Sequence, residues 1–197
     1  MTHSQMALKE WASAVQALEQ GEQILIMRKG GIREETRDFR VVSDAFYLYP
    51  TYEHQKPHLI KDSAQPRLQE TLDGWNPDDR QVTISSWAEL VRDIEISDGE
   101  TLEKLQPFHI WTETFAEERL KWKRKQPLHV MLLRVYKLDN PVTLAVDPSY
   151  EGCKSWIELH GELESAGRTP VLSDEAFRAA VERVEKALAD DGPVNGA

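Results

Sequence analysis

The strongest strand signal in this chain is LHVMLLRVYKL, residues 128–138. Apolar side chains fill both faces of this run, with Val130 and Leu132 on one face and Met131 and Leu133 on the other. A short run of branched and long apolar residues is typical of a β-strand with much of its surface buried. Residues 141–146 are expected to pair with this run as a hairpin across Asp139 and Asn140.

The sequence before this run predicts a helix that leads into an antiparallel meander. Residues 5–20 place Leu8, Trp11, Val15 and Leu18 on one stripe of an amphipathic helix, and Gly21 suits its C-terminal cap. Strands are then expected over residues 23–28, 38–42 and 45–49, with a glycine turn at Gly30 and Gly31 and an end at Pro50.

The remaining elements follow from local signals along the chain. The predicted elements are a surface loop at 61–80, a strand at 81–85, a capped helix from Ser86, a helix at 100–105, a strand at 108–111, a helix from Thr112 to Trp122 and a last helix after Ser173. We therefore predict an α+β fold with a mainly antiparallel sheet and flanking helices. One domain is expected over residues 1–190, with an acidic insert at about 61–106 and a frayed tail at 191–197.

The composition and charge of the chain disfavour several classes of protein. The chain has 197 residues and a net charge of -10, and its acidity is concentrated in residues 62–103, which carry 11 acidic and 3 basic groups. A net negative charge disfavours indiscriminate binding to nucleic acid. The sequence has no long apolar run and no secretory signal, so we expect a cytoplasmic protein without membrane contact. The single cysteine, Cys153, is expected to be a half-buried thiol, and no metal site or cofactor is predicted.

Two groups of cations are candidate binding residues. Lys29 precedes Gly30 and Gly31, where backbone N–H groups and a cation suit an anion-binding nest, although the phosphate-loop pattern of the nucleotide triphosphatases is absent. The second group is the basic run around Trp122, a residue that suits stacking on a base. The predicted binding residues are Arg28, Lys29, Gly30, Gly31, Tyr52, His54, Arg119, Trp122 and Lys123.

A different set of residues suits metal-assisted hydrolysis of a phosphodiester. Glu10, Asp44, Glu53 and His54 are the candidate catalytic residues. The order of the carboxylates Glu10, Asp38 and Asp44 along the chain resembles that of nucleases of the restriction-enzyme type. The Asp/Glu-x-Lys element of those nucleases is missing, because Glu53 and Lys56 are one residue too far apart. A divalent metal is expected only under this alternative.

Several blocks resemble the prokaryotic family known as domain of unknown function 1802. This resemblance implies no activity or residue role. The matching blocks are residues 7–11, 28–32, 49–55, 118–122, 127–136 and 152–156. The order of helix, strand with a basic end, late strand and closing helix is also similar to the small barrel modules of the PUA, ASCH and EVE type, which bind RNA or modified bases.

Three hypotheses follow from these observations. The first is a non-enzymatic module that binds RNA, DNA or a modified nucleotide. The second is the metal-assisted phosphodiesterase or nuclease. The third is an interaction module whose acidic face meets a basic protein partner.

Overall fold

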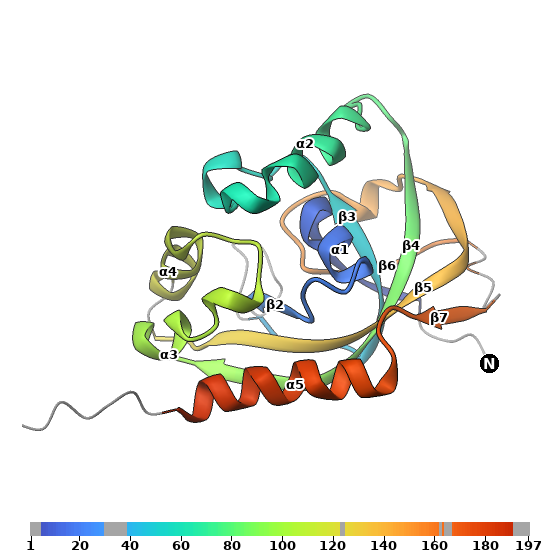
Figure 1. The fold of residues 1–197 in the computed structure, drawn as a ribbon. Coiled ribbons are helices and arrows are strands. Elements are labelled where there is room, and N and C mark those ends of the chain that lie inside the picture. The colour runs from blue at the N-terminus through green and yellow to red at the C-terminus, as the bar shows by residue number, and fades with distance from the viewer. Residues whose placement is uncertain (1–4, 30–38, 123–124, 162, 164–166, 191–197) are drawn as a thin grey trace, which may run out of the picture.

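The fold is a curled, mainly antiparallel sheet with five α-helices around it (Figure 1). It is described here from a computed structural model over residues 5–29, 39–122, 125–161, 163 and 167–190. The strands are β1 (Met6–Trp11), β2 (Leu25–Arg28), β3 (Ala45–Thr51), β4 (Gln81–Ile96), β5 (Leu128–Ala145), β6 (Trp156–Glu158) and β7 (Arg168–Pro170). The helices are α1 (Ala12–Glu19), α2 (Gln65–Asp73), α3 (Gly99–Glu103), α4 (Glu113–Lys121) and α5 (Asp174–Ala189). The predicted α+β class, with a mainly antiparallel sheet and flanking helices, is confirmed.

Strands β4 and β5 form the long antiparallel ribbon at the centre of the sheet. The predicted hairpin is wrong, since residues 128–145 form one strand that pairs with β4 from Ile96↔Leu128 to Gln81↔Ala145. The register shifts between Ile84 and Ser86, opposite the segment that contains Pro141. Because proline has no N–H to donate to the ladder, an irregularity at this point lets the strand continue past it.

The helix predicted from Ser86 is also wrong, because residues 81–96 are all β4. Its capping-box spacing is a local signal, whereas β4 pairs with β5 on one side and with β3 on the other. Tertiary pairing therefore overrides the local preference, and Ser86 and Ala88 become fully buried within the sheet.

Only the second half of the predicted first helix is helical. Residues 6–11 form β1, which pairs in parallel with β3, and α1 begins at Ala12. Leu8, Trp11, Val15 and Leu18 nevertheless all enter the main hydrophobic core, so the pattern identified the buried residues but not the change of element. Gly21 has a φ of 71° just after α1, as the predicted C-terminal cap requires.

The sheet is not a meander. Its order is β2-β5-β4-β3-β1-β6, and β7 pairs with β5. Strands β2 and β3 are separated by β5 and β4, so the antiparallel meander predicted over residues 23–49 is wrong. Gly30, Gly31 and the tail 191–197 lie outside the described residues.

Several local predictions change in detail. Residues 39–43 are not a strand, β3 continues through Pro50 to Thr51, and residues 61–80 contain α2 instead of a loop. The strand predicted at 108–111 is reduced to a single bridge between Trp111 and Ile60. The helices predicted at 100–105, at 112–122 and after Ser173 are confirmed as α3, α4 and α5, with Thr112 and Ser173 as side-chain N-caps.

The curl of the sheet determines which residues meet. In Figure 1, α1 lies within the curl and α5 runs along the β4–β5 ribbon. The hydrophobic core takes residues from both helices, including Val15, Leu18, Phe177 and Val184.

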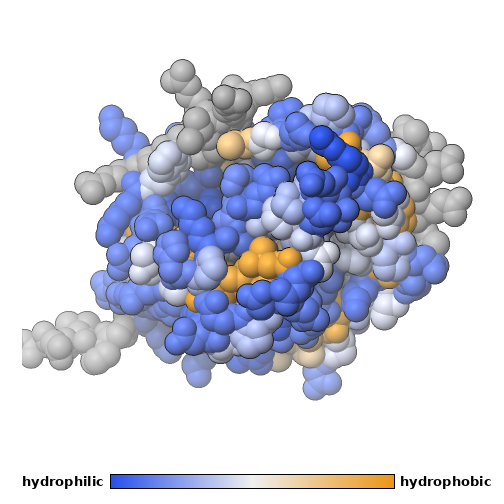
Figure 2. All heavy atoms as spheres, turned by 90° about the horizontal axis from the view of Figure 1, so that it is seen from above, coloured by the Kyte–Doolittle hydropathy of each residue, from blue (hydrophilic) through white to orange (hydrophobic). Residues whose placement is uncertain are grey.

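No helix in the described part of the chain has the length and apolar character needed to cross a membrane. The face seen from above is mostly hydrophilic, with one hydrophobic patch near its middle and smaller hydrophobic areas toward its edge (Figure 2).

Candidate functional site

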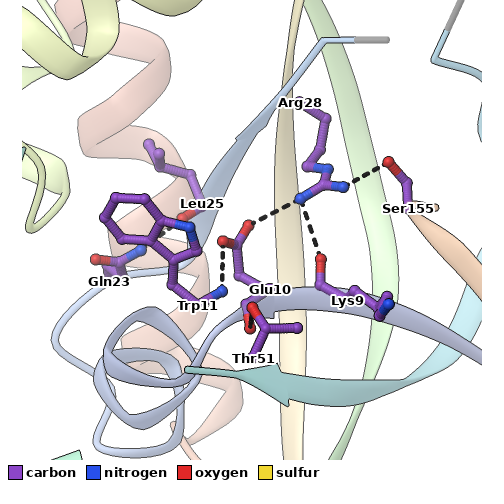
Figure 3. Close-up of polar contacts among 8 residues, drawn as sticks. All are labelled: Lys9, Glu10, Trp11, Gln23, Leu25, Arg28, Thr51 and Ser155. Atoms are coloured by element: carbon purple, nitrogen blue, oxygen red, sulfur yellow. Dashed lines mark hydrogen bonds and ion pairs between the residues drawn. The ribbon is translucent and has the colours of Figure 1, made fainter. Parts of the chain in front are cut away.

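A buried charge pair joins β2 to β1. The Arg28 guanidinium on β2 lies with Nη1 3.6 Å from Oε2 of Glu10 on β1, and the two side chains are 11% and 4% exposed. Arg28 also donates hydrogen bonds to the Lys9 carbonyl at 3.0 Å and to the Ser155 hydroxyl at 2.5 Å (Figure 3). Arg28 therefore links the end of β2 to β1 and to the segment that precedes β6.

The Glu10 carboxylate accepts a hydrogen bond at one oxygen, while its other oxygen has the ion pair with Arg28 but no hydrogen bond. Its Oε1 accepts a hydrogen bond from the Trp11 N–H at 2.8 Å, and Figure 3 shows the carboxylate turned toward Arg28. Glu10 Oε2 and Arg28 Nε are both buried and have no hydrogen-bond partner within the described residues. Buried polar atoms without partners are uncommon, because each loses its hydration without a replacement. Here the two atoms that lack hydrogen-bond partners belong to the two members of one ion pair, Glu10 and Arg28.

Arg119 on α4 adds a second guanidinium to this pair. Its side chain lies over the Phe115 ring, with Cζ 5.0 Å from the ring centroid, and is partly exposed. Burial lowers the pKa of Arg119, and the positive charge of Arg28 lowers it further, while Glu10 raises it. Arg28, Arg119 and Glu10 therefore act on one another electrostatically although they come from three different elements.

Lys29 brings a third cation to the same end of β2. The side chain is 4% exposed and its ammonium group donates a hydrogen bond to the Leu120 carbonyl on α4. Burial lowers the pKa of Lys29. Among the described residues, the cluster thus combines three cations with the one carboxylate of Glu10, and we call Glu10, Arg28, Lys29 and Arg119 the basic cluster.

The basic cluster is locally positive in a protein whose net charge is -10. Cations that lose water on burial are stabilised by nearby negative charge, and one carboxylate does not balance three of them. An anion that reaches the half-buried Arg119 would improve this balance.

The predicted binding residues are only partly brought together. Arg28, Lys29 and Arg119 meet at the basic cluster, and Trp122 follows directly on α4 with 46% of its surface exposed. Tyr52 stacks instead on Trp75, with ring centroids 5.6 Å apart and an interplanar angle of 7°. Gly30, Gly31 and Lys123 lie outside the described residues.

The structure separates the residues of the nuclease hypothesis. Asp44 precedes β3 and is exposed, whereas Glu53 and His54 follow the other end of β3 and are also exposed. A seven-residue strand separates its ends by about 20 Å, so Asp44 does not share a site with His54. The residues described contain no group of three His, Cys, Asp or Glu side chains placed to hold a metal ion.

Sequence reasoning missed Lys9 and Ser155. Lys9 points away from Arg28, toward Tyr49, and donates hydrogen bonds to the carbonyls of Tyr150 and Gly152, the latter at 3.1 Å. Burial lowers the pKa of Lys9 and raises that of Tyr49 to about 12. Ser155 carries no sequence signal for its role, because its contact with Arg28 spans 127 positions along the chain.

Solved structures similar to this fold include two crystal structures of ASCH from Zymomonas mobilis. One, a mutant form, has a TM-score of 0.46 and 11% identity, and the alignment covers 91% of this chain and 95% of that one. The other has a TM-score of 0.45 and 12% identity, with 91% and 94% covered. No residue role is transferred from them.

No curated protein matches this chain in sequence. A family model does, and it extends over residues 7–183, from β1 into α5. This range contains the whole basic cluster and both strands that Arg28 connects. The chain therefore belongs to the family described as domain of unknown function (DUF1802).

Proposed function

We propose that this protein is a non-enzymatic module that binds nucleic acid or a modified nucleotide through a phosphate group at the basic cluster. The observation that carries the proposal is the charge imbalance at this cluster: among the described residues, Arg28 and Arg119 interact with the one carboxylate of Glu10, and Lys29 adds a third cation beside them at the end of β2. A phosphate is a suitable counter-charge because guanidinium groups bind its oxygens through paired, charge-assisted hydrogen bonds.

Arg119 is the residue that would contact the ligand. Arg28 is already held by the Lys9 carbonyl, the Ser155 hydroxyl and Glu10, and Lys29 is held by the Leu120 carbonyl. Arg28 and Lys29 would therefore attract an anion electrostatically, without contacting it directly. Arg119 is half-buried, lies over the Phe115 ring and is three residues before Trp122, which is 46% exposed.

The acidity of the rest of the chain favours a discrete ligand over extended coverage of a polyanion. A protein with a net charge of -10 repels nucleic acid over most of its surface, so attraction is confined to the locally positive region. Trp122 provides a face on which one base can stack. A short single-stranded segment, or one nucleotide, matches this combination.

Fluorescence anisotropy with labelled single-stranded RNA and DNA, a duplex and mononucleotides tests the proposal over a series of salt concentrations. Arg119→Gln should weaken binding of the preferred probe about tenfold and reduce the slope of log K against log salt by about 0.7 for a single strand. Arg178→Gln is the matched control, because Arg178 is an exposed arginine on α5. Absence of salt-sensitive affinity for every probe, or an equal loss in the control, would overturn the proposal.

A further inference from the structure

Helix α4 presents two faces of opposite electrostatic character. Arg119 and Phe115, four residues apart, lie on the face directed at the basic cluster. Glu113, Ala116, Glu117 and Leu120 lie on the other face, which borders α3. The first face takes part in the proposed function, whereas the second has no part in it.

A cleft of about 230 Å³ separates this second face from α3. Its apolar surface comes from Leu102 on α3 and from Ala116 and Leu120 on α4. Its volume is below the roughly 300–1,000 Å³ of pockets that hold drug-sized ligands, so it suits one or two apolar side chains. We call this feature the α3–α4 cleft.

The rim of the α3–α4 cleft is acidic. Glu103, Glu113 and Glu117 border it, and Lys121, the one cation among its described lining residues, forms an ion pair with Glu117 at 3.0 Å. Asp98 and Glu100 add two more carboxylates at the start of α3. This rim repels phosphate, so the α3–α4 cleft does not extend the nucleic-acid site.

We propose that the α3–α4 cleft docks a basic segment of a partner protein, with one apolar side chain of that segment inserted between Leu102, Ala116 and Leu120. Charge complementarity selects the partner, because Lys or Arg residues on either side of the anchor would face the glutamates of the rim. The apolar side chain supplies affinity because its insertion removes apolar surface from water. The charges determine the orientation of the bound segment and the rate at which it associates. This inference does not depend on the proposed function.

The probe for the test is a synthetic 12-residue peptide with one central leucine and lysines spaced around it. Two-dimensional NMR of the ¹⁵N-labelled full chain follows the backbone signals of Leu102, Ala116 and Leu120 during titration. We expect these signals to shift in a saturable way, and the affinity to fall severalfold when salt is raised from about 50 to about 300 mM. A peptide with serine in place of leucine, and one with glutamates in place of lysines, should both bind at least about fivefold more weakly.

Two double variants separate docking in the cleft from attraction by net charge. Glu113→Gln with Glu117→Gln should weaken the leucine peptide about fivefold or more. Glu175→Gln with Glu182→Gln makes the same change in net charge on exposed positions of α5 and should leave affinity within about twofold. Thermal unfolding of both variants shows whether each remains folded.

The proposal is overturned if the α5 variant loses as much affinity as the α4 variant, if the shifted signals lie away from the cleft, or if no saturable binding occurs. Its failure is distinct from failure of the nucleic-acid site. The α4 variant retains Arg119 and the rest of the basic cluster, so it should still bind the nucleic-acid probe at least as well as the unmodified protein.

Discussion

Arg28 and Glu10 form a buried ion pair across the curl of the sheet. Their strands, β2 and β1, are separated by β5, β4 and β3 in the strand order, yet the guanidinium and the carboxylate lie 3.6 Å apart. The pair is therefore possible only because the sheet bends back on itself. Phe39 packs against the same arginine, with the guanidinium carbon 5.8 Å from the ring centroid, and also stacks on Trp156 of β6.

Removal of Arg28 should be strongly destabilising. In Arg28→Met the Glu10 carboxylate remains buried without its partner, and we expect a loss of about 3–5 kcal/mol in the free energy of unfolding, measured by urea denaturation. Arg92→Met is the control, because it removes an exposed ion pair with Glu185, and should cost about 0–1 kcal/mol. The double variant Glu10→Gln/Arg28→Met should be more stable than Arg28→Met alone. Equal losses in Arg28→Met and Arg92→Met would contradict a structural role for the pair.

Stability should fall in mild acid because of His109. Burial, assisted by the charge of Lys61, lowers the pKa of His109 to about 3 from an ordinary value of 6.5. Between these two pH values the unfolded chain binds a proton that the folded chain excludes, so this contribution is complete above about pH 6.5 and is lost as the pH decreases. The slope should approach about 1.4 kcal/mol per pH unit.

The pH dependence can be assigned by substitution. In His109→Gln the slope of unfolding free energy between pH 6.5 and pH 3 should decrease, as measured by urea denaturation at several pH values. His58→Gln changes an exposed histidine and should leave the slope unaltered. An unchanged slope in His109→Gln would show that another group governs acid unfolding.

Gly21→Ala should destabilise the turn after α1. Gly21 has a φ of 71°, and a Cβ there would lie 2.7 Å from Cδ2 of Leu172. The left-handed conformation alone costs a residue with a Cβ about 1–2 kcal/mol, and the contact with Leu172 adds to that cost. Gly74→Ala, at the end of α2, meets only the Glu70 carbonyl at 3.6 Å and should change the midpoint of thermal unfolding little. If the two variants unfold at the same temperature, this account of Gly21 is wrong.

Trp122 and Tyr52 are the two candidates for stacking on a base. Tyr52 stacks on Trp75, and Trp122 is 46% exposed three residues after Arg119. Trp122→Ala should weaken binding of a single-stranded probe by about 1–3 kcal/mol in the anisotropy measurement. Trp75→Ala is the control, and a larger loss there would move the base-binding surface to the Tyr52–Trp75 pair.

Local signals in the sequence predicted elements that depend on local contacts. The caps Thr112 and Ser173 accept hydrogen bonds from N–H groups three residues later, so the start of α4 and α5 could be predicted from the chain itself. The segment at Ser86 shows the limit of such signals. Its capping-box spacing is genuine, but pairing with β3 and β5 satisfies the same backbone groups in a strand.

The sequence predicted the residues of the candidate site, but it divided them between two separate hypotheses. Arg28, Lys29 and Arg119 were expected to bind an anion, while Glu10 was assigned to a separate metal-dependent hypothesis. The structure places Glu10 against Arg28 and separates it from Asp44, since β1 pairs with β3 in parallel and curls toward β2. Side chains on strands that have three other strands between them in the sheet have no periodic relation in the sequence.

The sequence by itself determined which residues are buried and which carry charge. Leu8, Trp11, Val15 and Leu18 were identified as core residues even though their element was misread, because transfer of apolar surface from water depends little on backbone conformation. Only the tertiary structure decided which charged side chains lie close together. The Arg28–Glu10 pair and its electrostatic interaction with Arg119 depend on the curl of the sheet, and this curl results from strand pairing between segments more than a hundred residues apart.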